Sequence, residues 1–271
     1  DGAWWVQLAP VGEPTLGPTA FMHRASSGEN PTAPLGHHWQ DSTHITFNVV
    51  TAGFGWRAVS LEGSAFHGRE PDEDRLDIEG GQVDSAAGRL RLSLPGGWSA
   101  QVSHGFLKEP EALEEGSAHR TTASLHYGAE GDRPFAASLL WGRNREEHGV
   151  SDSWLAEGAW QASRADHAYA RIEWAEKDRH LLQFKGGEDH HEEETPEIAR
   201  IGALTVGYLR DLVVRPALRV GIGADLTAYA FPSGLEPVYG DFPLSWHAFV
   251  RVRWGRPHGA HGGSAHSGHV P

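Results

Sequence analysis

Apolar and polar residues alternate along most of the chain, in stretches of about ten residues that match the period of a half-buried β-strand. In the stretch WHAFVRVRW (246–254), one face carries only tryptophan, alanine and valine, and the other carries His247, Arg251 and Arg253. A period near 3.6 residues dominates no long window, so no helix is expected. Comparable stretches, some of them weaker, lie at residues 4–9, 43–53, 57–66, 88–94, 98–107, 120–128, 135–144, 154–163, 167–177, 199–209 and 218–229.

The connections between these stretches alternate in length when they are counted back from the last strand. The short ones are 211–217, 164–166, 128–134, 95–97 and 53–55; the long ones are 230–244, 178–198, 108–118, 67–82 and 10–42; and 145–152 is intermediate. Short periplasmic turns and longer extracellular loops are typical of outer-membrane barrels, whereas a β-sandwich has no reason to keep this order. We therefore predict an all-β fold, an antiparallel up-and-down transmembrane β-barrel of about twelve strands over residues 1–254, with a flexible His- and Gly-rich tail at 255–271.

The two faces of the predicted strands fit lipid outside and water inside. The apolar faces hold mainly Leu, Val, Ala and Gly, with aromatic residues near the strand ends. In the stretch 43–53, the alternation places Ile45, Phe47 and Val49 on the apolar face and aims His44 inward. The charged side chains expected in the lumen are Glu62, Arg89, Arg91, Glu157, Arg171, Glu173, Arg219, Asp225, Arg251 and Arg253. Their mixed signs fit either a narrow channel or an interior closed by ion pairs.

Composition changes this picture in a few ways. Mean hydropathy is −0.46, yet a barrel needs only one apolar face per strand. The 11 tryptophans suit a lipid–water boundary, and the absence of cysteine excludes thiolate metal sites and Cys nucleophiles. The net charge of −13 argues against nucleic acid as a partner. The first strand is a stub and no signal peptide is visible, so either a signal has been removed or the chain is a fragment that lacks strands at its N-terminus.

Three sequence blocks occur in order: GEPTLGPTAFMHR (12–24), LGHHWQDSTHITFNVVTAGF (35–54) and FHGREPDEDRLDIEGG (66–81). With these blocks, and with WSAQVSHGFLKEPEALE and WGRN further on, the chain resembles a group of uncharacterised, porin-like outer-membrane proteins of Gram-negative bacteria. The resemblance covers most of the chain and implies a barrel in the bacterial outer membrane. Outer-membrane lipid, lipopolysaccharide and the barrel-assembly machinery are then the expected partners.

The second block contains a cluster of candidate ligands, His37, His38, Asp41 and His44, where the longest connection enters a strand. Imidazoles with a carboxylate suit Zn²⁺, Cu²⁺ or Ni²⁺, so the cluster is a candidate metal or ligand site at the mouth of the barrel. The alternative is that these groups only form hydrogen bonds at the rim. A hydrolase site built from His44, Asp41 and Ser42 is a further alternative.

Other candidate cation ligands lie in the loops and the tail. Glu70, Asp72, Glu73 and Asp74 offer oxygens for Ca²⁺ or for cations that bridge lipopolysaccharide, and Arg69 beside them is expected to pair with a carboxylate. A solvated acidic loop explains the same residues. Weaker metal sites of histidine are expected in a long loop and in the tail, at His190, His191, His258, His261, His266 and His269.

The residues therefore predict a porin-like or structural barrel that passes or binds small polar solutes or metal ions, and that is not an enzyme. An outer-membrane hydrolase acting at the barrel rim and a soluble all-β binding protein are the alternatives.

Overall fold

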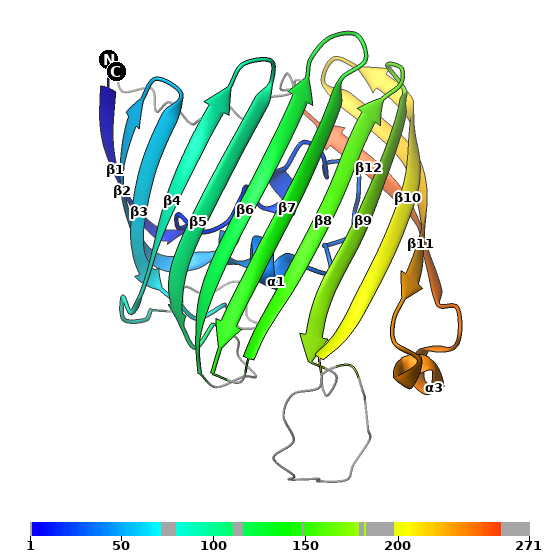
Figure 1. Cartoon of the computed structure of the whole chain (residues 1–271). Helices are drawn as coiled ribbons and strands as arrows, with labels where there is room; N and C mark the ends of the chain where they lie inside the picture. The colour runs from blue at the N-terminus through cyan, green and yellow to red at the C-terminus, as the bar shows by residue number, and fades with distance from the viewer. Residues whose placement is uncertain are drawn as a thin grey trace.

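A computed structural model describes residues 2–71, 80–110, 116–147, 149–178, 182 and 198–255. It contains one antiparallel sheet in which each strand pairs with the next along the chain, in the order β1 to β12 (Figure 1). The strands are β1 (Gly2–Gly12), β2 (Thr46–Trp56), β3 (Val59–His67), β4 (Ser85–Leu94), β5 (Trp98–Lys108), β6 (Ser117–Ala129), β7 (Phe135–Glu146), β8 (Gly149–Gln161), β9 (Asp166–Asp178), β10 (Ile198–Arg215), β11 (Leu218–Ala230) and β12 (Leu244–Trp254). The predicted all-β, up-and-down architecture is confirmed.

The strand boundaries differ from the sequence pattern in several places. Strand β2 runs through the turn expected at 53–55, and β10 runs into the turn expected at 211–217. Two further differences concern β1 and the connection between β7 and β8. The stub expected at residues 4–9 is a full strand, β1, which pairs with β2 from Gly2↔Trp56 to Gly12↔Thr46. The connection expected at 145–152 is a tight turn, because β7 continues to Glu146 and β8 begins at Gly149. Both corrections lengthen strands whose alternation fades at the ends.

The described ladders leave the sheet open, since β1 pairs only with β2 and β12 only with β11. The β2–β3, β4–β5, β6–β7, β8–β9 and β10–β11 turns lie at one end of the sheet, together with the start of β1 and the end of β12. The other connections, including the tight β7–β8 turn, join the strands at the opposite end (Figure 1). No helix in the described part of the chain is long and apolar enough to cross a membrane. The helical turns are η1 (Phe21–His23), α1 (His37–Gln40), η2 (Ser42–His44), η3 (Ser233–Leu235) and α3 (Glu236–Tyr239).

The outer face of the sheet is apolar. Val250 is 67% exposed and Ile172 59%, while their neighbours across the pleat, Arg251 and Arg171, point inward. Trp154 and Trp160 both face outward on β8, and six residues of strand separate them by roughly 20 Å. Aromatic bands at about this separation flank the apolar belt of outer-membrane barrels. An outer face of this kind does not fit the soluble alternative.

The alternation of β2 is the exception to the predicted faces. Phe47 and Val49 were expected on the lipid side, yet both are buried on the inside. Asn48 between them has a positive φ of 54°, and the β2–β3 register shifts between Phe47 and Val50. Beyond this bulge, Thr51 faces inward and Val50 outward, as in the other strands. The apolar pair turns inward because Leu16 lies inside the sheet and packs against Val49.

Leu16 belongs to the segment between β1 and β2, residues 13–45, which we call the inner segment. Its sequence predicted a long outer loop, and this expectation was wrong: the segment folds back inside the curve of the sheet, where α1 packs against β6, β7 and β8 (Figure 1). Gly142 on β7 makes this approach possible. A Cβ atom at that position would lie 2.2 Å from the main-chain oxygen of Trp39 in α1.

Candidate functional site

A cluster of buried charges fixes the inner segment to the wall of the barrel. The Arg24 guanidinium donates from Nη1 to Asp41 Oδ2 at 2.8 Å and from Nε to Glu157 Oε1 at 2.6 Å. Arg171 donates to the other oxygen of Glu157 at 3.0 Å. Arg24 and Asp41 belong to the inner segment, Glu157 to β8 and Arg171 to β9. Each buried charge thus has a partner, as a low-dielectric interior requires.

The electrostatics of Asp41 follow from its neighbours. Burial alone would raise the pKa of this carboxyl group, but the hydrogen bond from His37 and the charge of Arg24 outweigh burial and lower the pKa below 3.8. Asp41 is therefore ionised at neutral pH, and it holds Arg24 in the orientation that meets Glu157.

Further polar contacts join the inner segment to the wall at many points. They include Thr15 N to Ser64 Oγ, Gly17 N to Ser103 Oγ, Leu35 N to Glu173 Oε2, Trp39 Nε1 to Ser151 Oγ, Arg120 Nη1 to Ser42 Oγ and Arg171 Nη2 to Ser27 Oγ, all between 2.6 and 2.9 Å. Their partners come from β3, β5, β6, β8 and β9. Each such hydrogen bond contributes only about 1 kcal/mol net to stability. These contacts therefore stabilise the segment together, and no single one of them dominates.

The predicted lumen charges lie on the inner face and form separate groups. Glu62 accepts from Arg89 at 2.8 Å and lies 3.6 Å from Arg91. On the opposite strands, Asp211 lies 3.3 Å from Arg219 and 2.8 Å from Arg251. Asp225 accepts from His247 and Tyr169, Glu173 lies 4.0 Å from Arg171, and Arg253 contacts Glu29 of the inner segment.

The predicted mouth cluster comes together around α1 and η2. The ring of His37 lies 5.5 Å from that of His38 and 5.3 Å from that of His44, measured between centroids. Its Nδ1 donates to Asp41 Oδ1 at 2.6 Å. Burial, together with the charge of His37, lowers the pKa of His44 from its ordinary value and so favours the neutral ring. Among the described residues, no three His, Asp or Glu side chains are placed to hold a metal ion.

The hydrolase site expected from His44, Asp41 and Ser42 does not form in the structure. The Asp41 carboxylate faces His37 and Arg24, while the Nδ1 of His44 lies 3.2 Å from the main-chain oxygen of Asp41. The hydroxyl of Ser42 accepts a hydrogen bond from Arg120 instead of meeting a histidine. No nucleophile–base–acid arrangement forms from these residues.

The candidates in the loops are only partly described. Arg69 is exposed, and Glu70 lies 3.6 Å from His38, which links the third sequence block to the second. The other predicted cation ligands, Asp72, Glu73, Asp74, His190, His191, His258, His261, His266 and His269, lie outside the described residues.

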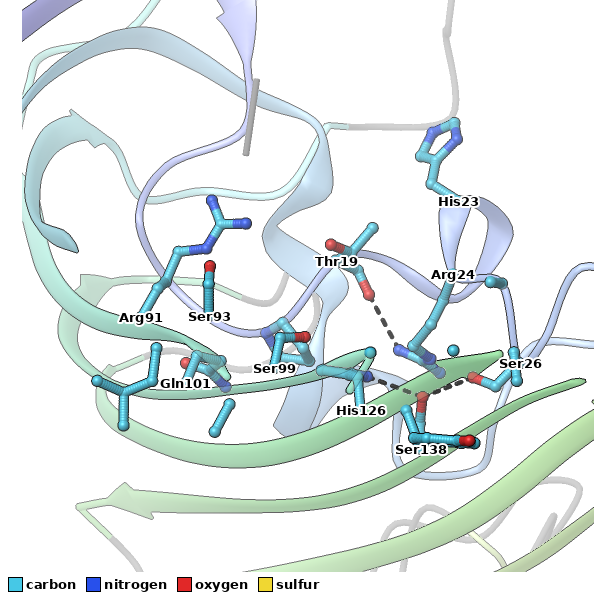
Figure 2. Close-up of a pocket in the computed structure, with 18 of the residues that line it drawn as sticks. Thr19, His23, Arg24, Ser26, Arg91, Ser93, Ser99, Gln101, His126 and Ser138 are labelled. Atoms are coloured by element: carbon cyan, nitrogen blue, oxygen red, sulfur yellow. Dashed lines mark hydrogen bonds between the residues drawn. The ribbon is translucent and has the colours of Figure 1, made fainter. Parts of the chain in front are cut away.

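A polar cavity of about 530 Å³ lies beside the inner segment, towards the short turns, between this segment and strands β4 to β7 (Figure 2). Its lining includes Glu13, Thr19, His23, Arg24 and Ser26 from the inner segment and Arg89, Arg91, Ser93, Ser99, Gln101, His126 and Ser138 from the wall. In Figure 2, a chain of hydrogen bonds crosses from Ser26 through Ser138 to His126, with distances of 2.6 and 2.8 Å.

Sequence reasoning missed the inner half of this cavity. Arg24 and Ser26 lie in a stretch without strand alternation, which offered only its sequence block as a signal. His126 and Ser138 lie in two of the expected strands, 120–128 and 135–144, but neither is among the candidate residues of the sequence.

Comparisons with known proteins bear on the fold. No protein-family model matches the chain, and no curated protein sequence matches it. An anion-selective porin from Comamonas acidovorans has a similar structure, with a TM-score of 0.52 at 11% identity, over 83% of this chain and 63% of the porin. A loop-deletion mutant of OmpT, an outer membrane protein of Vibrio cholerae, gives a TM-score of 0.50 at 9% identity, over 93% of this chain and 74% of that protein.

This chain therefore spans less than two thirds of the length of the Comamonas porin. At these identities the likeness concerns architecture alone. Together with the apolar outer face and the polar interior, it gives the chain the fold of the bacterial outer-membrane β-barrels.

Proposed function

We propose that this protein is a porin-like, non-enzymatic outer-membrane barrel that admits small polar solutes through a lumen restricted by the inner segment. The observation that carries the proposal is the Arg24–Glu157 contact, which ties the inner segment to the wall while a polar cavity stays open beside it. The Comamonas neighbour is named as a porin, and that name supports a pore function for the same architecture.

The sequence blocks fit this proposal. The block at 12–24 contains Arg24, the block at 35–54 contains Asp41, and the two meet in one ion pair inside the barrel. The block at 66–81 contributes Glu70, beside His38. Membership of the porin-like group that carries these blocks is part of the proposal, with the inner segment and its neighbouring loop as the shared feature.

A reversible covalent lock tests whether the inner segment controls passage. The chain contains no cysteine, and the hydroxyls of Ser26 and Ser138 lie 2.6 Å apart, so Ser26→Cys with Ser138→Cys introduces one disulfide between segment and wall. In planar bilayers we expect the wild type to conduct, and the oxidised double variant to conduct differently from its reduced form.

The two single-cysteine variants are the controls, because neither can form the bond and a reductant should leave both unchanged. A wild type that forms closed barrels and still shows no conductance in any salt would rule out the pore. If the oxidised and reduced double variants conduct equally, the inner segment does not control the passage of ions.

A further inference from the structure

We propose that the cavity beside the inner segment is a binding site for a small hydroxylated organic anion, one with a phosphate or carboxylate group at one end and hydroxyl groups along its body. The inference deepens the proposed function, on which it rests, by naming the class of solute that the lumen holds.

The charges around the cavity favour an anion. Its ionisable lining contains Arg24, Arg89, Arg91, His23, His126, Tyr127 and a single carboxylic acid, Glu13. Arg24 is already paired with Asp41 and Glu157, so the arginines that matter here are Arg89 and Arg91. Two of these arginines share one carboxylate, because Arg89 and Arg91 both face Glu62. Arg89 takes the close contact, at 2.8 Å, and Arg91 keeps a distance of 3.6 Å.

Arg91 is therefore the group best placed to meet an anion. Its side chain is 35% exposed, against 14% for that of Arg89, and both line the cavity. Glu13 is the acid on the opposite side of the balance, and burial raises the pKa of its carboxyl group. Inside a protein wall a charge acts through a lower effective dielectric than in bulk water, so the partly exposed Arg91 favours an anion over a neutral solute.

The remaining lining suits hydroxyl groups. Ser93, Ser99 and Gln101 project from β4 and β5, and Thr19 and Ser26 project from the inner segment (Figure 2). Hydroxyl and amide side chains both donate and accept hydrogen bonds, as a sugar or a hydroxy acid requires. The volume of about 530 Å³ falls within the usual range for sites that hold one small ligand.

The test is equilibrium binding of a matched pair of probes, glucose 6-phosphate and glucose, to the full chain folded in detergent, measured by titration calorimetry. We expect the wild type to bind the phosphate and to bind glucose at least about tenfold more weakly. Arg91→Gln should weaken the binding of glucose 6-phosphate by about tenfold or more, because one charged hydrogen-bonding group is lost. Arg215→Gln is the matched control, since it removes the same charge from an exposed position at the end of β10, away from the cavity.

A second variant separates a built site from general attraction of anions to positive charge. Ala136 lines the cavity from β7, so Ala136→Phe fills part of it without changing any charge and should also abolish binding. Far-ultraviolet circular dichroism and gel migration with and without heating confirm that each variant folds. Equal affinity for the two probes, or unchanged phosphate binding in Arg91→Gln or in Ala136→Phe, would overturn the proposal.

The outcomes also separate the site from the pore. If the protein conducts in planar bilayers but binds neither probe, the proposed anion site is wrong and the proposed pore function stands. If the protein binds glucose 6-phosphate through Arg91 but does not conduct, the anion site stands and the proposed pore function is wrong.

Discussion

Arg24 and Glu157 form a buried ion pair, with 2.6 Å between Nε and Oε1, although one lies in the segment after β1 and the other in the middle of β8. Their side chains are 3% and 1% exposed. The pair links the inner segment to the far wall of the sheet, and Asp41 and Arg171 complete its coordination on either side. The position of the inner segment therefore depends on a contact that is both distant in sequence and shielded from solvent.

Replacing Arg24 with alanine should loosen the inner segment strongly. The change leaves Asp41 and Glu157 buried without their shared partner, and breaking a buried pair in this way costs about 3–5 kcal/mol. We expect a lower unfolding midpoint in denaturant and faster cleavage between residues 13 and 45 by an added protease. Arg143→Ala is the control, because its pair with Asp152 is exposed and worth at most about 1 kcal/mol. Similar losses in both variants would contradict the structural role of Arg24.

The stability that Asp41 contributes should depend on acid pH. Its pKa is lower in the fold than the ordinary 3.8, so its contribution is fully present above that value and is lost as the pH falls through the lower, folded value. Unfolding midpoints of wild type and Asp41→Asn, measured from pH 7 downwards, should differ at neutral pH and converge in strong acid. A difference that stays constant over the whole range would show that the carboxylate charge is not the cause.

Enlarging Gly142 should expel α1 from its place against β7. Because a Cβ there would lie 2.2 Å from the main-chain oxygen of Trp39, Gly142→Val forces the two backbones apart, at a cost of about 1–3 kcal/mol or more. Protease sensitivity of the inner segment reports the displacement. Gly63→Val on β3 is the matched control, since the nearest atom to its Cβ is 3.9 Å away. An inner segment equally protected in both variants would argue against the close approach.

Metal binding stays a prediction from the sequence, and the contacts of His37 argue against the mouth cluster as its site. His37 is engaged by Asp41, which in turn is held by Arg24, so His37→Ala combined with His44→Ala should leave Zn²⁺ affinity unchanged. Removing residues 256–271, with His258, His261, His266 and His269, should reduce it. Calorimetric titration of Zn²⁺ into both variants decides this. If the double His variant loses Zn²⁺ binding and the truncated protein keeps it, the mouth cluster is the metal site.

The strands and their faces were predictable because a period of two is a local property. Residues such as Arg89, Arg171 and Asp225 face inward as their neighbours in sequence implied, and the order of short and long connections identified the two ends of the sheet. The pattern failed at Phe47 and Val49 because a bulge at Asn48 and an apolar partner, Leu16, changed which side is buried.

The path of the inner segment was not predictable in the same way. Nothing near Arg24 in the sequence indicates that its partner is Glu157, and Asp41 was read as a rim ligand because the adjacent histidines suggested metal chemistry. Long connections between strands of a barrel usually lie outside, so the general rule pointed away from the lumen. The inside position of the segment follows from its contacts with strands that come much later in the chain, such as the contact of Arg24 with Glu157.

The place of the inner segment in the chain also has a consequence for assembly. The segment leaves the ribosome before β8 and β9, yet its charged anchor needs Glu157 and Arg171 from those strands. Until they are in place, the pair of Arg24 and Asp41 stays hydrated, since Arg24 lacks the Glu157 carboxylate that its burial requires. Docking of the first connection is thus a late event in folding, and it marks the moment at which the wall opposite has been completed.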